Sequence, residues 1–320
     1  MKAMTDLTSA RIKAKALELG FDLCGIAPAA DYPELKFLRE WLDRGYAGEM
    51  AYLNRSADRR ADVRHVIPSA KSVIVTATIY NTDRPYSTES KNPAHAHVAR
   101  YAWGDDYHDV IGKRMEQLHD WMRTASSEPF EARAYVDTGP VQERVYAQYA
   151  GIGWIGKNTC VINAEKGSWI FLAEIICSLQ LDYDRPAFDQ CGTCTLCIEA
   201  CPTKAIVAPG VLDSNRCISY LTIEHRGDIP EGFHDAIGTH VYGCDVCQEV
   251  CPWNAVPPIS EDPAWQPRRL WDGATVGDLA SRQDDELRAA MRGSAMRRTK
   301  VAGLRRNLVV SRHAIGVVDD

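Results

Sequence analysis

Cys191-Gly-Thr-Cys194-Thr-Leu-Cys197-Ile-Glu-Ala-Cys201-Pro202 is the stretch from which the organisation of this chain can be worked out. Its four cysteines follow one another at intervals of three, three and four residues, and a proline closes the run. This spacing is typical of [4Fe–4S] ligation, in which each thiolate binds one iron of a cubane. In the two-cluster form of the run, the fourth cysteine binds the other cluster. The stretch therefore predicts a second half elsewhere in the chain.

A second group of cysteines completes the pattern downstream. Cys217 stands alone, and Cys244-Asp-Val-Cys247-Gln-Glu-Val-Cys251-Pro252 repeats the intervals of three and four and the closing proline. Exchange of the fourth ligand between the halves gives two sets of four thiolates. The sets are Cys191, Cys194, Cys197 and Cys251, and Cys201, Cys217, Cys244 and Cys247. Cys217 lies 27 positions before Cys244, a departure from an ordinary two-cluster ferredoxin, but the count of eight ligands closes.

Zinc sites and disulfides are the alternative uses of these cysteines. Paired Cys-x-x-Cys spacing also builds tetrahedral zinc sites, but a triple at three-residue intervals followed by Cys-Pro suits a cubane better. Disulfides are disfavoured because the chain begins Met-Lys-Ala-Met-Thr-Asp without a secretory signal, and thiols stay reduced in the cytoplasm. We therefore predict two [4Fe–4S] clusters in a cytoplasmic protein. Cys24, Cys160 and Cys177 lie in or beside apolar segments and are expected to be buried small side chains.

Length and composition set the broad class. A chain of 320 residues is long for one compact unit, so two or three domains are expected. Hydrophobic residues at 45% and charged residues at 25% are ordinary for a soluble globular protein. The longest apolar run, Trp169–Ile176, is strand-sized and contains Glu174, so no membrane contact is expected. The net charge of −6 argues against indiscriminate nucleic-acid binding but leaves room for a local basic surface.

The first 180 residues mix helical and strand patterns. One-face apolar spacing predicts helices over 8–20 and 33–45, and the β-branched run 72–80 predicts a buried strand. Further strands are predicted over 21–27, 133–137 and 168–179, and further helices over 109–124 and 141–150. Such a mixture is typical of an α/β or α+β sandwich.

Three parts follow along the chain. They are an α/β core over 1–180, a cysteine module over 181–258 and a C-terminal helical segment over 259–320. In the last part we predict helices over 275–292 and 294–312. From Arg288 to Arg312 there are eight Lys or Arg and no Asp or Glu, which indicates either a phosphate-binding surface or a solvated helix face.

Iron–sulfur clusters pass single electrons, so the first part should hold a second redox centre or a docking site. The loop Gly151-Ile-Gly-Trp-Ile-Gly-Lys-Asn-Thr159 is a candidate, because its glycines let backbone N–H groups approach a ligand and Lys157 and Asn158 add donors. It matches neither a dinucleotide fingerprint nor a Walker loop, and a plain turn is the alternative. The scattered histidines show no metal-binding spacing, so no separate zinc or non-haem iron site is predicted.

Asp137 and the run Asp105–His108 are candidate polar site residues. Asp137 ends a predicted strand, and desolvation could raise its pKa from about 3.9 so that it acts as a general acid. The alternatives are a cap for the helix near Val141 or an Asx-turn before Gly139. For Asp105–His108 the alternative is simple helix capping, with His108 a surface residue.

Several long motifs together resemble one family. They are Tyr135–Arg144, Ala150–Thr159, Arg100–His108 and the two-part cysteine pattern that ends Cys251-Pro-Trp-Asn254. In this order they resemble the epoxyqueuosine reductases, and the resemblance runs from the N-terminal helix through at least Asn254.

The resemblance implies an α+β oxidoreductase with a nitroreductase-like core that holds cobalamin, a ferredoxin-like module with two [4Fe–4S] clusters and a short C-terminal helical segment. It implies reduction of the epoxide of epoxyqueuosine in tRNA to queuosine, with the clusters feeding electrons singly to cobalt until Co(I) is reached. The implied partners are the tRNA anticodon stem-loop and an unidentified low-potential electron donor. We expect a monomer.

The resemblance also implies roles for single residues. Asp137 would donate a proton to the substrate, and Asp106 and Tyr107 would line the substrate face. The segment against the cofactor would contain Arg144, Gly153, Lys157 and Asn158. Many relatives continue into a helical-repeat tail that this chain lacks, so tRNA binding is predicted for Arg297, Arg298, Arg305 and Arg306. Ala99 stands where some relatives carry a cysteine near cobalt, so a thiol is not essential here.

Three other functions fit parts of the pattern. A reductive dehalogenase also couples cobalamin to two [4Fe–4S] clusters, but such enzymes usually carry a twin-arginine export signal. A pure electron carrier would use the first half for docking and would show no corrinoid absorbance. A nucleic-acid-binding module with structural clusters would hold no reducible cobalt.

Overall fold

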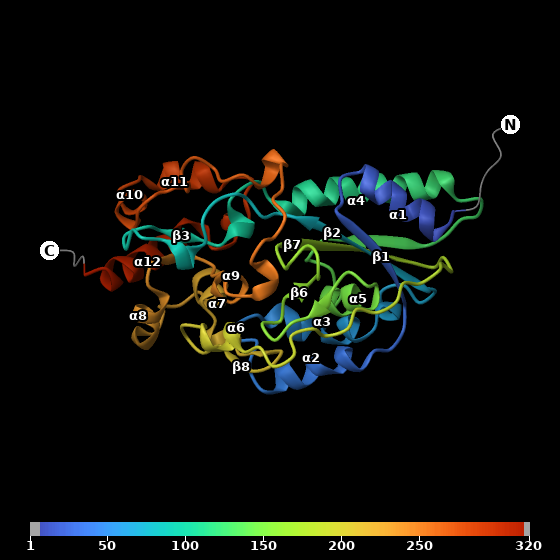
Figure 1. Cartoon of the computed structure of the whole chain (residues 1–320), viewed down its shortest axis with the longest axis horizontal. Helices are drawn as coiled ribbons and strands as arrows, with labels where there is room; N and C mark the ends of the chain where they lie inside the picture. Colours follow the sequence, from blue (N-terminus) through green and yellow to red (C-terminus); the bar gives the residue numbers. More distant parts are fainter. Residues whose placement is uncertain (1–6, 317–320) are drawn as a thin grey trace.

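A four-stranded antiparallel sheet organises the first part of the computed structural model, which describes residues 7–316. Its strands run in the order β1 (Leu23–Pro28), β2 (Ser72–Ile79), β7 (Ile170–Cys177) and β4 (Ala132–Tyr135). Every residue of β2 is buried, because helices cover both faces of the sheet (Figure 1). The predicted strand over 72–80 is thereby confirmed, whereas the strand predicted over 133–137 ends before Asp137.

Helices cover the sheet on both faces. Successive side chains of a strand point to opposite faces, and both sets of apolar side chains have to be covered. The helices are α1 (Ser9–Glu18) and α4 (Tyr107–Ala125) on one face, and α2 (Pro33–Asp43), α3 (Ala51–Ala61) and α5 (Glu143–Tyr149) on the other. Ile74 and Ile175 pack in the core under α1 and α4, whereas Val75 and Ile176 pack in the core on the α5 face. The mixed helix and sheet fold predicted from the sequence is confirmed, including the helix over 8–20 capped by Thr8.

The cysteine module is built from short elements that follow the sheet. They are α6 (Leu196–Glu199), β8 (Ile206–Ala208), β9 (Val211–Leu212), α7 (Ile218–Ile223), α8 (His234–Ile237), β10 (His240–Tyr242) and α9 (Val246–Glu249). The two cysteine-bearing helices α6 and α9 pack against each other. Strand β10 pairs in parallel with β3 (His97–Val98), which joins the module to the segment before α4. A small hairpin, β5 (Trp154–Ile155) and β6 (Val161–Ile162), carries the glycine-rich loop.

The C-terminal segment differs from its prediction. The single helix predicted over 275–292 is wrong: α10 (Val276–Ala280) and α11 (Asp284–Met291) are separate, because Thr275 and Gln283 each begin a helix with a capping box. The helix predicted over 294–312 is a 3₁₀ turn followed by α12 (Lys300–Ala314).

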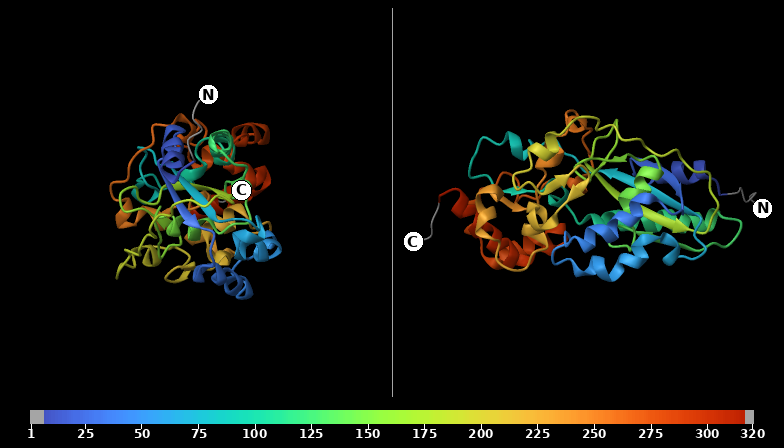
Figure 2. Two further views of the ribbon diagram at one scale, coloured as in Figure 1. Left: turned by 90° about the vertical axis from the view of Figure 1, so that its right-hand side faces the viewer. Right: turned by 90° about the horizontal axis from the view of Figure 1, so that it is seen from below.

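Helix α12 packs on α7, α8 and β10, so the C-terminal segment and the cysteine module share a hydrophobic core that contains Val241 and Leu304. Figure 2 shows both at the end of the molecule opposite to the sheet. The division at 180 and 258 stays a prediction. The helices described within residues 7–316 include none with the length and hydropathy of a membrane span. The chain start, on which the missing export signal was judged, lies outside these residues.

Candidate active site and cluster-binding loops

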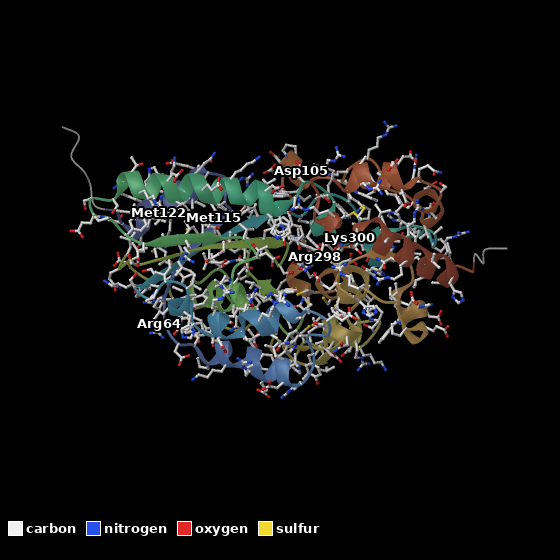
Figure 3. All side chains as sticks on the ribbon, turned by 180° about the vertical axis from the view of Figure 1, so that it is seen from behind. Arg64, Asp105, Met115, Met122, Arg298 and Lys300 are labelled. Carbon is white, nitrogen blue, oxygen red and sulfur yellow. The ribbon has the colours of Figure 1, made fainter. Side chains whose placement is uncertain are left out.

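A cavity of about 880 Å³ lies between the sheet core and the C-terminal segment. Its lining includes Tyr52 and Arg60 of α3, the start of α4, the loop after β4, and residues of the cysteine module and the 3₁₀ turn. Figure 3 labels Arg298, one of the lining residues, between Met115 of α4 and Lys300 of α12. This volume is near the upper end of ordinary small-molecule sites, about 300–1,000 Å³. The cavity therefore has room for a large ligand.

Asp137 projects into this cavity from the loop after β4. Its Oδ2 accepts a hydrogen bond from the Tyr107 hydroxyl at 2.9 Å and lies 3.3 Å from Nε2 of His108. Its backbone N–H donates to Oε1 of Glu143 at 2.6 Å. The backbone has φ +58°, a left-handed conformation that costs a side-chain-bearing residue about 1–2 kcal/mol. Three contacts thus hold an otherwise unfavourable conformation.

His108 lies between two carboxylates. Its Nδ1 is 2.7 Å from Oδ1 of Asp106, whose side chain is 2% exposed, and its Nε2 faces Asp137. Burial lowers the pKa of His108, but the hydrogen bonds to the two carboxylates outweigh burial and raise it to about 9. The interpretation of His108 as a surface residue is therefore wrong. The predicted capping is confirmed, because Asp106 also accepts the backbone N–H of His108.

The prediction that the pKa of Asp137 is raised is wrong. Burial raises the pKa of Asp137, but hydrogen bonds from His108 and Tyr107 and the charge of Arg144 outweigh it, so the pKa lies below its usual value. Asp137 does not cap α5 either, since Gln142 is the N-cap residue. Near neutral pH Asp137 is therefore ionised, and the proton between the two side chains lies on His108, which is an imidazolium.

Two glutamates behind Asp137, the buried Glu174 and the half-buried Glu143, received no role from the sequence. Glu174 lies in β7, paired with Tyr135 of β4, and is fully buried. Burial and the neighbouring Glu143 carboxyl raise the pKa of Glu174 well above its usual range. Burial and Asp137 raise the pKa of Glu143 to about 7. The one available signal was a charged residue inside the apolar run Trp169–Ile176.

The cysteines of the module fall into two spatial groups. Burial raises the pKa of Cys197 to about 11, and the thiols of the other three members of its predicted set contribute. The other group is linked in the same way: Cys217 interacts with Cys201, Cys244 with Cys217, and Cys247 with both Cys244 and Cys217. Within residues 7–316 no three His, Cys, Asp or Glu side chains converge on a single-ion site. In a cubane each thiolate binds a different iron.

The glycine-rich loop lies against the cysteine module. Nζ of Lys157 donates to the carbonyl oxygens of Gly192 and Cys194 at 2.7 and 2.9 Å, and Nδ2 of Asn158 donates to that of Cys247 at 3.1 Å. Their position between the core and both cysteine loops was not foreseen, and their contact with cobalamin stays a prediction.

Two more residues predicted near the cofactor lie in the same region. A Cβ on Gly153 would lie 2.3 Å from the carbonyl oxygen of Ile162, so only glycine fits the β5–β6 hairpin. Arg144 donates to the carbonyl oxygen of Thr159 at 3.0 Å. The described contacts of these two residues stabilise the loop.

The four arginines predicted to bind tRNA separate into two pairs. Arg297 and Arg298 line the cavity, where Nε of Arg297 is 3.3 Å from Oδ2 of Asp106 and Arg298 makes two bonds to Glu224 at 2.8 and 2.9 Å.

The other pair is engaged within the fold. Arg305 binds Asp284 at 2.9 Å and the carbonyl oxygen of Ala280 at 2.7 Å, and Arg306 donates to carbonyl oxygens of Leu221, His225 and Gly227, each at 2.7 Å. The unbroken positive charge of this segment therefore has a partly structural origin.

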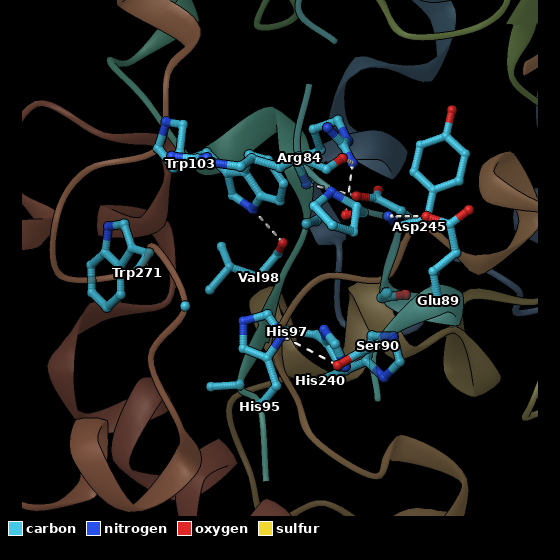
Figure 4. Close-up of a pocket in the computed structure, with 18 of the residues that line it drawn as sticks. Arg84, Glu89, Ser90, His95, His97, Val98, Trp103, His240, Asp245 and Trp271 are labelled. Carbon is cyan, nitrogen blue, oxygen red and sulfur yellow. Dashed lines mark hydrogen bonds between the residues drawn. The ribbon is translucent and has the colours of Figure 1, made fainter. Parts of the chain in front are cut away.

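A second cavity of about 340 Å³ lies beside Cys244 and Asp245. His95, His97 and His240 gather at one end of it, with successive ring centroids 4.9 and 5.3 Å apart (Figure 4). Burial and the two neighbouring histidines lower the pKa of His97 to about 3, so this ring is neutral near pH 7.

Comparison with known proteins shows which family this chain belongs to. Residues 60–138 match the family model described as "Epoxyqueuosine reductase QueG, DUF1730", and residues 190–254 match the "4Fe-4S double cluster binding domain". The epoxyqueuosine reductase of Gloeobacter violaceus is 44% identical over 320 residues, which cover 98% of this chain and 97% of that protein.

Two solved structures share the fold. An epoxyqueuosine reductase crystallised with an epoxyqueuosine-modified tRNA-Tyr stem loop superposes with a TM-score of 0.86 at 29% identity, over 95% of this chain and 80% of that one. An epoxyqueuosine reductase from Bacillus subtilis, with its catalytic aspartate loop swung out of the active site, gives a TM-score of 0.86 at 28% identity, over 97% and 82%. By sequence and by structure, this chain belongs to the epoxyqueuosine reductase family of oxidoreductases.

Proposed function

We propose that this protein reduces the epoxide of epoxyqueuosine in tRNA to queuosine, using cobalamin and two [4Fe–4S] clusters, in the cytoplasm. The observation that carries the proposal is the placement of Asp137, Tyr107 and His108 in one large cavity that Arg297 and Arg298 also line. The family relationship supplies the reaction, and the relative bound to a tRNA stem loop supports the substrate class.

The residues present fit the proposed cofactors. The cysteine side chains form two groups of four, the donor set of two cubanes, and Trp154 and the backbone of Ala205 donate hydrogen bonds to the sulfurs of Cys191 and Cys201. The cavity has room for a large ligand such as a corrin, which Arg60 and Tyr101 on its wall would contact. Bound cobalamin would supply the low-potential electrons for the reduction, received one at a time from the clusters.

Asp137 would provide one of the two protons that the reaction consumes. Conversion of an epoxide to an alkene releases its oxygen as water and consumes two electrons and two protons. The imidazolium of His108 is 3.3 Å from Oδ2 of Asp137 and can pass a proton to it, while Tyr107 holds the same oxygen in place. The protonated Asp137 then faces the cavity and can donate its proton to the substrate oxygen. His108 would then be the source of this proton.

Anaerobic reconstitution tests the whole proposal. Protein reconstituted with iron, sulfide and cobalamin should show a corrinoid absorbance band and bind about eight iron atoms. With a low-potential chemical reductant and epoxyqueuosine-containing tRNA, nucleoside analysis should show queuosine. Protein reconstituted without cobalamin is the control and should leave the epoxide intact. Protein that holds both clusters and cobalamin but leaves epoxyqueuosine unchanged would contradict the proposal.

The two arginine pairs make separable predictions for tRNA binding. Neutralising Arg297 and Arg298 to glutamine removes two cations that are 63% and 52% exposed, so the slope of log Kd against log salt should fall by about 2. The matched double variant Arg305→Gln/Arg306→Gln should keep the slope and instead lower the thermal midpoint, because its hydrogen bonds lie within the fold. Titration of tRNA at several salt concentrations measures this. Equal slopes for the parent and the Arg297/Arg298 variant would remove this surface from tRNA recognition.

A further inference from the structure

A carboxyl group is buried in the sheet directly behind the Asp137 loop. Glu174 is 0% exposed at the centre of β7, and its register places it between Val75 of β2 and Tyr135 of β4. Among the described residues neither of its oxygens has a hydrogen bond of normal geometry. Alternation along β7 directs Glu174 to the sheet face covered by α5, the helix that Glu143 begins.

Glu143 connects this buried carboxyl to the loop. Its side chain adjoins Glu174 and interacts with it. Its Oε1 accepts the backbone N–H of Asp137 at 2.6 Å, a short contact of the kind that ionised acceptors make. Asp137 has a left-handed backbone, so the loop needs such a partner to keep the Asp137 side chain facing the cavity.

The charges around the pair limit its ionisation. Glu143 faces Asp137, Glu174 and Arg144, and Glu174 faces Glu143, Asp137 and Arg60. Arg60 is engaged with the carbonyl oxygen of Val141 at 2.7 Å. Three adjoining carboxyls with two partial counter-charges cannot all ionise at low cost. Glu174 therefore stays neutral, and Glu143 changes charge near pH 7.

We propose that Glu143 is a positioning residue that holds the Asp137 loop in the active site, and that Glu174, kept neutral in the sheet, governs whether Glu143 is charged. The catalytic meaning of this pair rests on the function proposed above. The Bacillus subtilis relative has its catalytic aspartate loop swung out, so a loop of this kind has a second position there. In this chain the Glu143 carboxylate favours the inward position, and its protonation releases the loop.

The pH dependence has a definite sign. Glu143 is ionised above its pKa of about 7 and is then a strong acceptor for the Asp137 N–H. As the pH falls through about 7, the acid form replaces the carboxylate and the hydrogen bond weakens. A hydrogen bond whose acceptor did not change charge would show no such pH dependence.

Hydrogen–deuterium exchange of the anaerobically reconstituted protein, without substrate, tests this. After correction for intrinsic rates, a peptide that covers 136–142 should exchange about tenfold faster below pH 7 than above it. Glu143→Gln should exchange at the faster rate at every pH, and Glu174→Leu should move the parental transition to higher pH, because the neutral Glu174 carboxyl lowers the pKa of Glu143. The exposed Glu128→Gln is the matched control and should behave as the parent. Peptides of α4 report whether each variant is folded.

Two outcomes separate this inference from the proposed function. If the parental loop exchanges without pH dependence, or Glu143→Gln matches the parent, the positioning role is wrong even when the protein makes queuosine. If exchange follows the prediction but loaded protein leaves epoxyqueuosine unchanged, the positioning role stands and the proposed reaction is wrong.

Discussion

Replacement of Asp137 by asparagine should lower the rate of epoxide reduction by about 10²–10⁴-fold, the usual contribution of a positioned acid. Asparagine keeps the shape of the side chain, and its oxygen can still accept the Tyr107 hydroxyl, but it has no acidic proton to donate. Single-turnover assays on epoxyqueuosine-containing tRNA measure the rate, and iron content and the corrinoid band show that the cofactors remain bound.

Asp105→Asn is the matched control for this change. Asp105 precedes the same helix, but its carboxylate binds Arg268 at 2.8 Å and does not line the cavity, so the rate should stay parental. In the parent the rate should fall as the pH rises through about 9, because His108 then loses the proton that it supplies to Asp137. A parental rate for Asp137→Asn with full cofactor content would show that the acid is another group.

The contrast between the cysteines and Asp137 shows what local sequence can determine. The cysteine sets depend on intervals of three and four residues and on one exchange rule, and the thiols lie in the corresponding groups. The environment of Asp137 depends on partners from other elements. Tyr107 and His108 come from α4, 30 and 29 residues earlier, and they reverse the expected shift of its pKa.

Long-range partners also explain the other differences. Arg306 resembles a free cation in sequence, yet it donates to carbonyl oxygens about 80 residues earlier, beyond the reach of any local pattern. Glu174 was visible as a charge in an apolar strand, but its importance depends on β4 and α5 packing beside it. Composition and periodicity predicted most of the helices and strands. The chemistry of the site depends on contacts between elements that are far apart in the sequence.

Replacement of Cys251 by alanine should abolish turnover and lower the iron content from about eight to about four atoms per chain. Cys251 lies in the second cysteine run, but its thiol adjoins those of Cys191 and Cys194. Loss of this ligand should therefore remove the cluster of the first run and interrupt electron flow. Cys24→Ser, a change in strand β1 outside both sets, is the control and should keep about eight irons.

The identity of the surviving cluster decides between exchange and local ligation. If fourth ligands are exchanged, Cys251→Ala and Cys197→Ala lose the same cluster and must leave the same electron paramagnetic resonance signal. Cys201→Ala and Cys247→Ala must leave the other signal, although Cys201 belongs to the first run. Ligation within each run predicts the opposite grouping, with Cys251→Ala matching Cys247→Ala. Since α6 and α9 pack against each other, each run presents its last cysteine to the partner run, and we expect the exchanged pattern.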